Sequence, residues 1–275
     1  MATRTWTGAG LDALASNAAN WDGAPAVGDS ITFDGVFPVT GNNDCTWDIT
    51  TNFNSIDIQS GYSGDITLTA AMNVTNAGLK ILSIDNAGTF DAGTRNVNCG
   101  TLLVDGTAAL TLLMGTGKWT VSGAASFTNT TMTFDAQTSA VAISGTGSIT
   151  TSANVTLYHF RALLGSVVTV GSNLDINGNL RMNAGATLDA GSFTINVAGD
   201  WVRVESGSGT AVFIKGTSTV IFDGVSTLDG ATDFHNLTFA AGAQVTLKTG
   251  HIFSCSGTFS APGTSGSQIT LDAVA

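Results

Sequence analysis

Apolar and polar residues alternate in short runs along most of the chain. The run Asp65–Thr69 reads Asp-Ile-Thr-Leu-Thr, and residues 118–121, 193–197 and 244–248 follow the same pattern. A period of two is typical of a β-strand with one buried face. Gly, Asn, Asp and Ser separate the runs, as expected for turns. The pattern therefore predicts an all-β protein built from short strands.

A degenerate repeat ends many of these runs. An apolar residue, then Asp, then a small residue recurs at Phe33-Asp34-Gly35, Phe90-Asp91-Ala92, Phe134-Asp135-Ala136, Leu188-Asp189-Ala190, Phe222-Asp223-Gly224 and Leu271-Asp272-Ala273. The uneven spacing of these copies argues against a propeller, whose blades repeat at a steady period. Coils of roughly 22 residues that each match only their neighbours would explain the irregularity.

The architecture that we expect is a right-handed parallel β-helix, a solenoid of roughly 11 coils over residues 31–275. Inward positions such as Ile195 would be apolar, and Asp and Gly would occupy the corners. Left-handed backbone angles are then expected at Gly93 and Gly191. A β-sandwich is the alternative, for which only Asn177-Gly178 and Asp105-Gly106 resemble hairpin turns.

Residues 1–30 form the expected N-terminal cap. Gly10–Asn20 is the best helix candidate of the chain, and it lies between Trp6 and Trp21. An open solenoid end would pair with any other strand, so we expect this cap and its tryptophans to cover the first coil. Residues 158–164 are expected to form a second short helical stretch, as a loop excursion.

The C-terminal strand 268–272 carries only three further residues. We therefore expect the last coil to be covered by another molecule, with a parallel homotrimer favoured because Thr-rich faces lose little on desolvation. The alternative is a monomer in which residues 260–266 fold back over the end.

Composition and charge narrow the function. Only 11% of the residues are charged, the net charge is -11, and the nine basic residues are scattered. Without a basic stripe, binding to nucleic acid or to an anionic membrane is not expected. The segment Met1–Trp6 lacks an apolar signal core, and no run of apolar residues is long enough to cross a bilayer.

The three cysteines are odd in number and far apart. Cys45, Cys99 and Cys255 form no CxxC pair and no cluster with histidine, so a zinc site is not expected. Each is expected to pack in the core as a small apolar residue. The sequence leaves open whether two of them form a disulfide.

Carboxylates and histidines give no catalytic signature. The chain has no adjacent pair of aspartates, and its densest acidic groups are Asp44 with Asp48 and Asp229 with Asp233. The aspartates of the repeat are interpreted as corner residues whose side chains bind nearby backbone amides. His159, His235 and His251 accompany no nucleophile motif, although His235 and His251 could meet within one coil. We assign no catalytic, cofactor-binding or metal-binding residue.

Three tryptophans could bind sugars if they were exposed. Trp47, Trp119 and Trp201 are spread along the chain, and an exposed aromatic face stacks on a sugar ring. Because their neighbours alternate as strand residues do, we favour core packing for all three.

The N-terminal segment resembles a known group of proteins. Trp6-Thr-Gly, Asn17–Trp21, Pro25, Gly28-Asp29 and Ile31–Phe33 are similar to the start of bacterial adhesin and autotransporter-like β-helix proteins, and related modules occur in phage virion proteins. Residues 234–239 and 256–259 resemble their tails. The resemblance implies a β-helix and an attachment role, and it transfers no catalytic residue.

The expected function is that of a non-enzymatic structural or attachment protein. A phage virion component, either a capsid decoration or a fibre-like appendage, is the favoured setting. A secreted bacterial surface adhesin passenger is the first alternative, and a polysaccharide-degrading β-helix enzyme is the second. The expected partners are other copies of the chain, a capsid or cell-surface protein, or a glycan.

Overall fold

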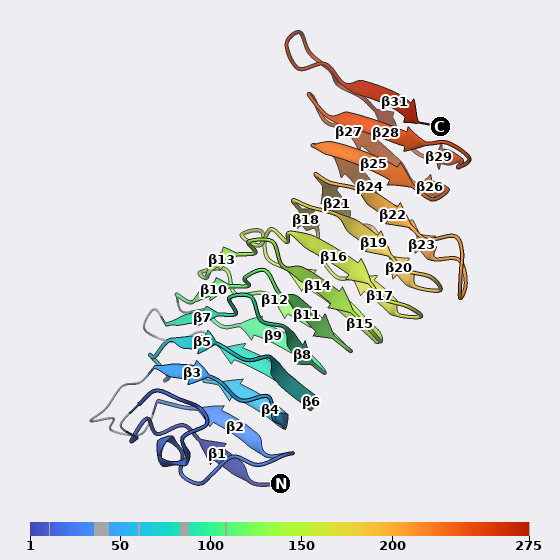
Figure 1. Ribbon diagram of the computed structural model, residues 1–275. Helices are drawn as coiled ribbons and strands as arrows, with labels where there is room; N and C mark the ends of the chain where they lie inside the picture. Colours follow the sequence, from blue (N-terminus) through green and yellow to red (C-terminus); the bar gives the residue numbers. More distant parts are fainter. Residues whose placement is uncertain (11, 36–43, 60, 83–87, 108, 275) are drawn as a thin grey trace. The chain divides into compact units, whose positions relative to one another are not determined.

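The computed structural model describes residues 1–10, 12–35, 44–59, 61–82, 88–107 and 109–274. Nearly all of its regular structure is β-strand, and the strands stack in parallel as the coils of a β-solenoid (Figure 1). Contacts divide the chain into two compact units. Unit 1 is Met1–Ser139 with Ser152–Val155, and unit 2 is Ala140–Thr151 with Thr156–Ala275.

Unit 1 has three stacks of strands. The first stack is β1 (Thr3–Thr5), β2 (Ser30–Phe33), β4 (Asn52–Ile58), β6 (Met72–Leu82) and β9 (Leu102–Asp105), followed by β12 (Ala125–Phe127). The second is β3 (Cys45–Trp47), β5 (Ile66–Leu68), β7 (Thr89–Asp91), β10 (Thr111–Leu113) and β13 (Thr133–Asp135). The third stacks β8 (Val97–Cys99) on the first residues of β6, and β11 (Lys118–Val121) on β8.

Unit 2 repeats this three-sided arrangement. One stack is β14 (Ala140–Ile143), β16 (His159–Ala162), β19 (Leu180–Met182), β22 (Trp201–Arg203), β25 (Val225–Asp229), β28 (Gln244–Lys248) and β31 (Thr270–Val274). Another is β15 (Thr146–Thr151), β17 (Val167–Val170), β20 (Thr187–Asp189) and β23 (Val212–Ile214). The third is β18 (Leu174–Ile176), β21 (Thr194–Val197), β24 (Thr219–Phe222), β27 (Asn236–Phe239) and β30 (Phe259–Ser260). A separate pair, β26 (Thr232–Phe234) and β29 (Phe253–Cys255), completes the last coils.

The prediction of a parallel β-helix is confirmed, and the β-sandwich is excluded because the ladders between described strands are parallel. The solenoid has about 10 turns. Turn length varies, since Thr3 pairs with Ser30, an offset of 27 residues, and Thr219 pairs with Asn236, an offset of 17. Asn177-Gly178 is a coil corner instead of a hairpin, because the Gly178 amide donates to the Tyr158 carbonyl of the preceding coil.

Apolar side chains from successive coils stack inside each unit. Leu174, Ile195 and Val220 are register partners and all are buried, so Ile195 points inward as predicted. Because burial alternates along the strands, a coil contributes one short apolar row to the interior from each side.

Aspartates close several corners, as the sequence predicts. Asp91 Oδ1 accepts a hydrogen bond from the Gly93 amide at 2.8 Å, and Asp189 Oδ1 accepts one from the Gly191 amide at 3.0 Å. The glycines have φ of 55° and 57°, in the left-handed region. Asp135 binds the Gln137 amide in the same way, and Gln137 adopts φ of 46° although it is not glycine.

Asparagine and aspartate side chains also tie each coil to the next. Asn173 Oδ1 accepts from the Thr194 amide at 2.9 Å, and Asn179 Oδ1 accepts from the Asp200 amide at 3.0 Å. Asp200 Oδ1 in turn accepts from the Thr227 amide at 2.9 Å. The abundance of these residues therefore reflects corner and inter-coil hydrogen bonds.

The helix predicted for the N-terminal segment is wrong. Within Gly10–Asn20 the only described helix is one 3-10 turn, η1 (Ala18–Asn20). The side-chain Nδ2 of Asn20 donates to the carbonyls of Asp12 and Leu14, which a longer helix would need for its own backbone bonds. Ala13 and Ala15 instead exchange backbone hydrogen bonds with Thr46 of β3.

The second helix expected from the sequence is absent from the described residues, and the cysteines are not paired. Residues 158–164 are not helical, because they contain β16, whose Phe160 pairs with Leu180 of β19. All three cysteines are free: Cys45 and Cys99 are buried as predicted, and Cys255 is half-buried. Burial raises the pKa of the Cys99 thiol to about 12, so this group is an inert core residue.

Candidate functional site

Charged side chains gather on the coils from β22 to β29 in unit 2. This charged cluster consists of Arg203, Glu205, Lys215, Asp229, Asp233, Lys248 and His251. It contains three of the nine basic residues of the chain and its only glutamate. In a chain with so few charges, this is the densest ionic group that the described residues form.

An insertion after β22 brings the cluster together. Leu180 pairs with Trp201 at an offset of 21 residues, whereas Trp201 pairs with Leu228 at an offset of 27. The extra residues form the exposed segment 204–210, in which Gly207 and Gly209 have positive φ. This detour turns Glu205 toward the next two coils, where it meets backbone and side-chain donors.

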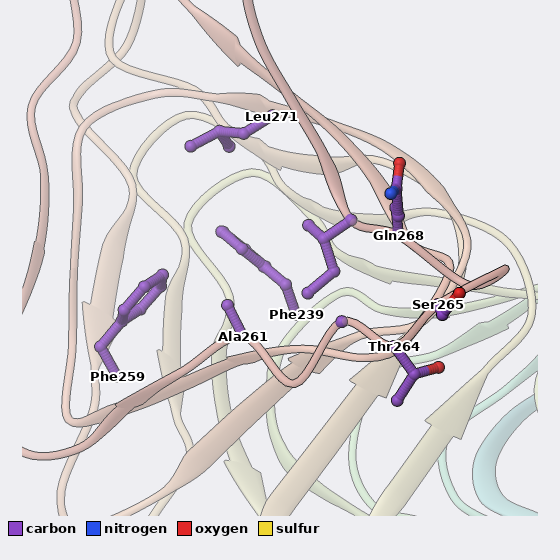
Figure 2. A pocket seen from close by; sticks show the side chains of 9 residues that line it. Phe239, Phe259, Ala261, Thr264, Ser265, Gln268 and Leu271 are labelled. Carbon is purple, nitrogen blue, oxygen red and sulfur yellow. The ribbon is translucent and has the colours of Figure 1, made fainter.

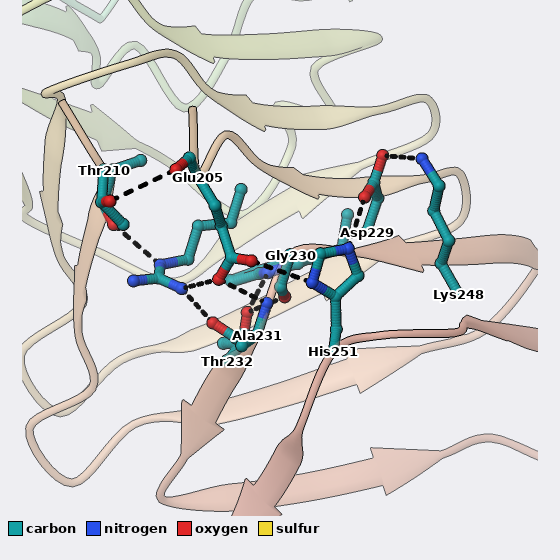
Figure 3. A network of polar contacts seen from close by, with 11 residues as sticks. Glu205, Thr210, Asp229, Gly230, Ala231, Thr232, Lys248 and His251 are labelled. Atoms are coloured by element: carbon teal, nitrogen blue, oxygen red, sulfur yellow. Dashed lines mark hydrogen bonds and ion pairs between the residues drawn. The ribbon is translucent and has the colours of Figure 1, made fainter. Parts of the chain in front are cut away.

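Glu205, His251 and Asp229 form a chain of contacts (Figure 3). His251 Nδ1 lies 2.9 Å from Glu205 Oε2, and its Nε2 lies 3.2 Å from Asp229 Oδ1. A neutral imidazole carries one N–H, so the ring can donate to both carboxylates only as an imidazolium. Lys248 Nζ reaches Asp229 Oδ2 at 2.8 Å and ends the chain.

Arg203 joins the insertion to the following coil. Its Nε donates to the Ala211 carbonyl at 2.8 Å, and its Nη1 donates to Glu205 Oε1 at 2.7 Å and to the Ala231 carbonyl. Glu205 Oε1 also accepts from the Ala231 amide at 2.8 Å. The guanidinium is therefore held in one position by groups on both sides of it.

The second half of the cluster surrounds Asp233. Its carboxylate accepts hydrogen bonds from Lys215 Nζ and, at 2.8 Å, from Ser254 Oγ. These two bonds, the one from Lys215 foremost, lower the pKa of Asp233 below its usual value. Lys215 Nζ also donates to Ser256 Oγ at 2.8 Å, so this lysine is bound as an ammonium and is not an available base.

A cleft of about 420 Å³ lies beside the cluster, where one ladder of the solenoid is interrupted. Among the described strands, β23 pairs with β20 alone and β26 pairs with β29 alone. The coil after the insertion is short, because Thr219 pairs with Asn236 only 17 residues on, so β26 begins close behind β25 and does not continue the ladder of β23. Residues of β23, β26 and β29 line the opening.

The chemistry that this cluster can perform is limited by its own contacts. Glu205 Oε1 accepts from Arg203 and the Ala231 amide, Asp229 Oδ2 accepts from Lys248, and the other oxygen of each carboxylate faces a ring nitrogen of His251. In the part of the chain that the structure describes, no group of three or more His, Cys, Asp or Glu side chains is placed to hold a metal ion. The arrangement stabilises the coils and fixes the walls of the cleft.

A second, apolar groove lies at the C-terminal end of unit 2 (Figure 2). It encloses about 650 Å³ between β30, β31 and the segment 261–268. Phe259 and Leu271 are each 56% exposed there. The segment 260–266 does turn back, with a bridge between Thr264 and Ser267, but it leaves these two side chains open to solvent.

The structure separates the other candidate residues. His251 joins the charged cluster, whereas His159 accepts a hydrogen bond from the Asn179 amide at 2.9 Å, and no contact among the described residues joins His235 to His251. Asp44 binds the Asp65 amide and Asp48 binds Ser16, as structural residues do. Trp47, Trp119 and Trp201 are fully buried, which confirms core packing and removes them as sugar-stacking surfaces.

Sequence reasoning did not predict the charged cluster. Its members are spread over residues 203–251, and no motif spacing connects them. The usable signal was compositional: the single glutamate stands two residues from Arg203, directly before the glycine-containing insertion.

Comparison with family models, with curated proteins and with solved structures gives no match to this chain. The resemblance of the N-terminal segment to adhesin-like β-helix proteins therefore stays a prediction. Within the described residues, no helix is long and apolar enough to span a membrane.

Proposed function

We propose that this chain is a non-enzymatic structural or attachment protein, and that its setting is a phage virion, as a capsid decoration or a fibre-like appendage. The observation that carries the proposal is the use of the polar groups. The carboxylates of the charged cluster and the Asn and Asp side chains at the corners bind partners within the solenoid. Side chains that bind partners within the solenoid make its coils rigid.

A general acid or base must reach its substrate with its proton-transferring atom. The carboxylates nearest to the cleft are Glu205 and Asp233, and both are held by cations. Each carboxylate is already fixed by its cation, and a catalytic role would require that pair to open. A structural or attachment protein can function with these ion pairs closed.

The exposed end of unit 2 supports self-association. Phe259 and Leu271 are each 56% exposed beside β31 and present apolar area to solvent. Exposed apolar patches favour contacts with a further protein surface. We propose a parallel homotrimer as the functional form, which multi-angle light scattering at low micromolar concentration tests directly. A clean species of one chain that stays soluble without residues 267–275 contradicts it.

Immunogold electron microscopy tests the setting. Antibodies against this chain are applied to purified particles and to cells of the source culture, with preimmune serum as the control. Gold on regular positions of phage particles supports the virion proposal. Gold on the cell envelope alone would favour the surface adhesin over the virion component. That alternative requires export of the chain from the cell. Protein found only free in the supernatant overturns both settings.

A polysaccharide-degrading enzyme is the second candidate, favoured by one observation. His251 lies between two carboxylates, beside a cleft. Incubation with acidic and neutral polysaccharides, followed by reducing-end detection, decides the matter. Release of sugars by the native chain and not by Glu205→Gln would establish the enzyme and refute the proposal above.

A further inference from the structure

We propose that the cleft between β23 and β26 binds a neutral sugar unit of an oligosaccharide. The inference deepens the proposed attachment function by naming its ligand, and only the biological purpose of the site rests on that function.

Part of the cleft lining is apolar. Val212 is 45% exposed and Ile252 is 79% exposed, while the half-buried Phe213 packs its ring against the buried Trp201, with ring centroids 5.0 Å apart. Large apolar side chains this open to water gain stability when a ligand covers them. The C–H faces of a sugar ring are a suitable cover, since aromatic and aliphatic side chains pack against them.

Asp233 and Ser254 supply a polar part of the lining, and it is preorganised. Asp233 Oδ1 accepts from Ser254 Oγ at 2.8 Å, and Lys215 holds the other oxygen, so the carboxylate is fixed in orientation. Each carboxylate oxygen and the serine hydroxyl have a second lone pair that can accept a ligand hydroxyl. Fixed acceptors of this kind give a binding cleft its specificity.

The charges that line the cleft are already balanced. Arg203 is paired with Glu205, and Lys215 with Asp233. An anionic ligand would have to compete with Glu205 for the guanidinium, and a cationic ligand would compete with Lys215 for Asp233. A ligand without charge disturbs neither pair, so the site favours neutral sugars over acidic ones.

The interrupted ladder adds one donor and one acceptor. The Val212 amide donates to Ala186 and the Ile214 carbonyl accepts from Ala190, so these two residues of β23 serve the preceding coil. Backbone groups of a parallel strand alternate between its two edges, so the amide and carbonyl of Phe213 face the β26 side, where no described ladder continues. A single exposed residue is too short an edge to hold an extended peptide, but it can bind one hydroxyl group.

The test measures binding of maltohexaose, cellohexaose, mannohexaose and chitohexaose by isothermal titration calorimetry. The two cleft variants are Ile252→Ser and Ser254→Ala, both at exposed side chains. Val225→Ser is the matched control, because Val225 is 71% exposed in the same unit and does not line the cleft. We expect at least one of the sugars to bind, and each cleft variant to weaken its Kd by about fivefold or more while the control leaves it unchanged.

Three results overturn the site. They are no binding of any of the four sugars at millimolar concentration, equal binding by cleft and control variants, and selection of a peptide by the cleft from a displayed library. Thermal unfolding of each variant verifies that the fold is retained. Binding is measured on the isolated chain, so its result does not depend on where the protein is located. A negative immunogold result would therefore refute only the virion setting, and a negative calorimetric result would refute only the sugar site.

Discussion

The first coil of unit 1 and the last coil of unit 2 end in different ways, although both carry stacked aromatic rings. At the start, Trp6 and Trp21 pack edge to face with ring centroids 5.0 Å apart, and both rest on Phe33 of β2. All three are buried. At the other end, Phe259 lies 5.5 Å from Phe239 but is itself 56% exposed.

Polar contacts reinforce the difference between these coils. Asp29 holds the first coil, because its carboxylate accepts hydrogen bonds from the Ala2 amide at 2.8 Å and the Ala26 amide at 3.2 Å, and it pairs with Arg4. On the last coil, the Asp272 carboxylate accepts a hydrogen bond from the neighbouring Ala273 amide at 2.8 Å. Stacked aromatic rings therefore stabilise the first coil, where they are buried. On the last coil, where Phe259 is exposed, they leave an apolar surface in contact with solvent.

The largest effect should come from opening the enclosed end. We expect Trp21→Ala to lower the free energy of unfolding by about 3–5 kcal/mol, because it removes a buried ring that covers Phe33. Phe259→Ala is the counterpart, and we expect it to cost less than about 1 kcal/mol because its ring is already largely in water. Urea unfolding followed by tryptophan fluorescence and circular dichroism measures both. Equal losses would refute the distinction between the ends.

Substitution of a corner glycine should destabilise both units by a similar amount. Gly93 in unit 1 and Gly191 in unit 2 have nearly the same φ, and an added Cβ meets no atom closer than 3.6 Å at either site. We expect valine at either position to destabilise by about 1–2 kcal/mol, from backbone strain alone. Thermal unfolding of the matched pair tests this, and a large cost at one corner only would mean that the units differ throughout.

The open end should control association more than stability. We expect the double variant Phe259→Ser with Leu271→Ser to unfold within about 1 kcal/mol of the native chain, since both side chains are half exposed. Its tendency to associate should fall, because less apolar surface remains beside the edge of β31. Light scattering across a concentration series measures this. Unchanged association would place the contact elsewhere on the chain.

The smallest expected effect is a pH dependence at the enclosed end. The hydrogen bond from the Ala2 amide, with those from Ala26 and Arg4, lowers the pKa of Asp29 in the folded chain. The stabilisation is therefore complete above the unfolded pKa of about 3.9, and it is lost as pH falls through the lower folded pKa. Hydrogen exchange at Ala2 and Ala26 should accelerate in that acid window. Asp29→Asn should remove this pH dependence, and persistence of the full effect in that variant would assign it to another carboxylate.

Much of the fold was predictable because it depends on local chemistry. Alternation along strands such as β21, corner aspartates such as Asp91 and left-handed glycines such as Gly93 act within a few residues, so their patterns are visible in the sequence. The helix over 10–20 failed because its carbonyls bind Asn20 and its backbone pairs with Thr46, a residue distant in the sequence. Local propensity could not anticipate that competition.

The candidate site could not be predicted from the sequence, because it also depends on contacts between residues far apart in the chain. Glu205, Asp229 and His251 meet only because one coil is long and the next is short, and turn lengths follow from the register of strands far apart in sequence. The burial of Trp47, Trp119 and Trp201 was predictable from their alternating neighbours. The position of the cleft followed from a missing ladder, which no residue pattern signals.

The interruption between β23 and β26 has a consequence for how unit 2 comes apart. In a solenoid, cooperativity passes from each coil to its neighbour, so the weakest junction sets where partial unfolding stops. At this junction two sides remain joined, through β22 with β25 and β24 with β27, while Arg203 spans the third. We therefore expect partial unfolding of unit 2 to stop at this junction more readily than between coils whose three ladders are all continuous.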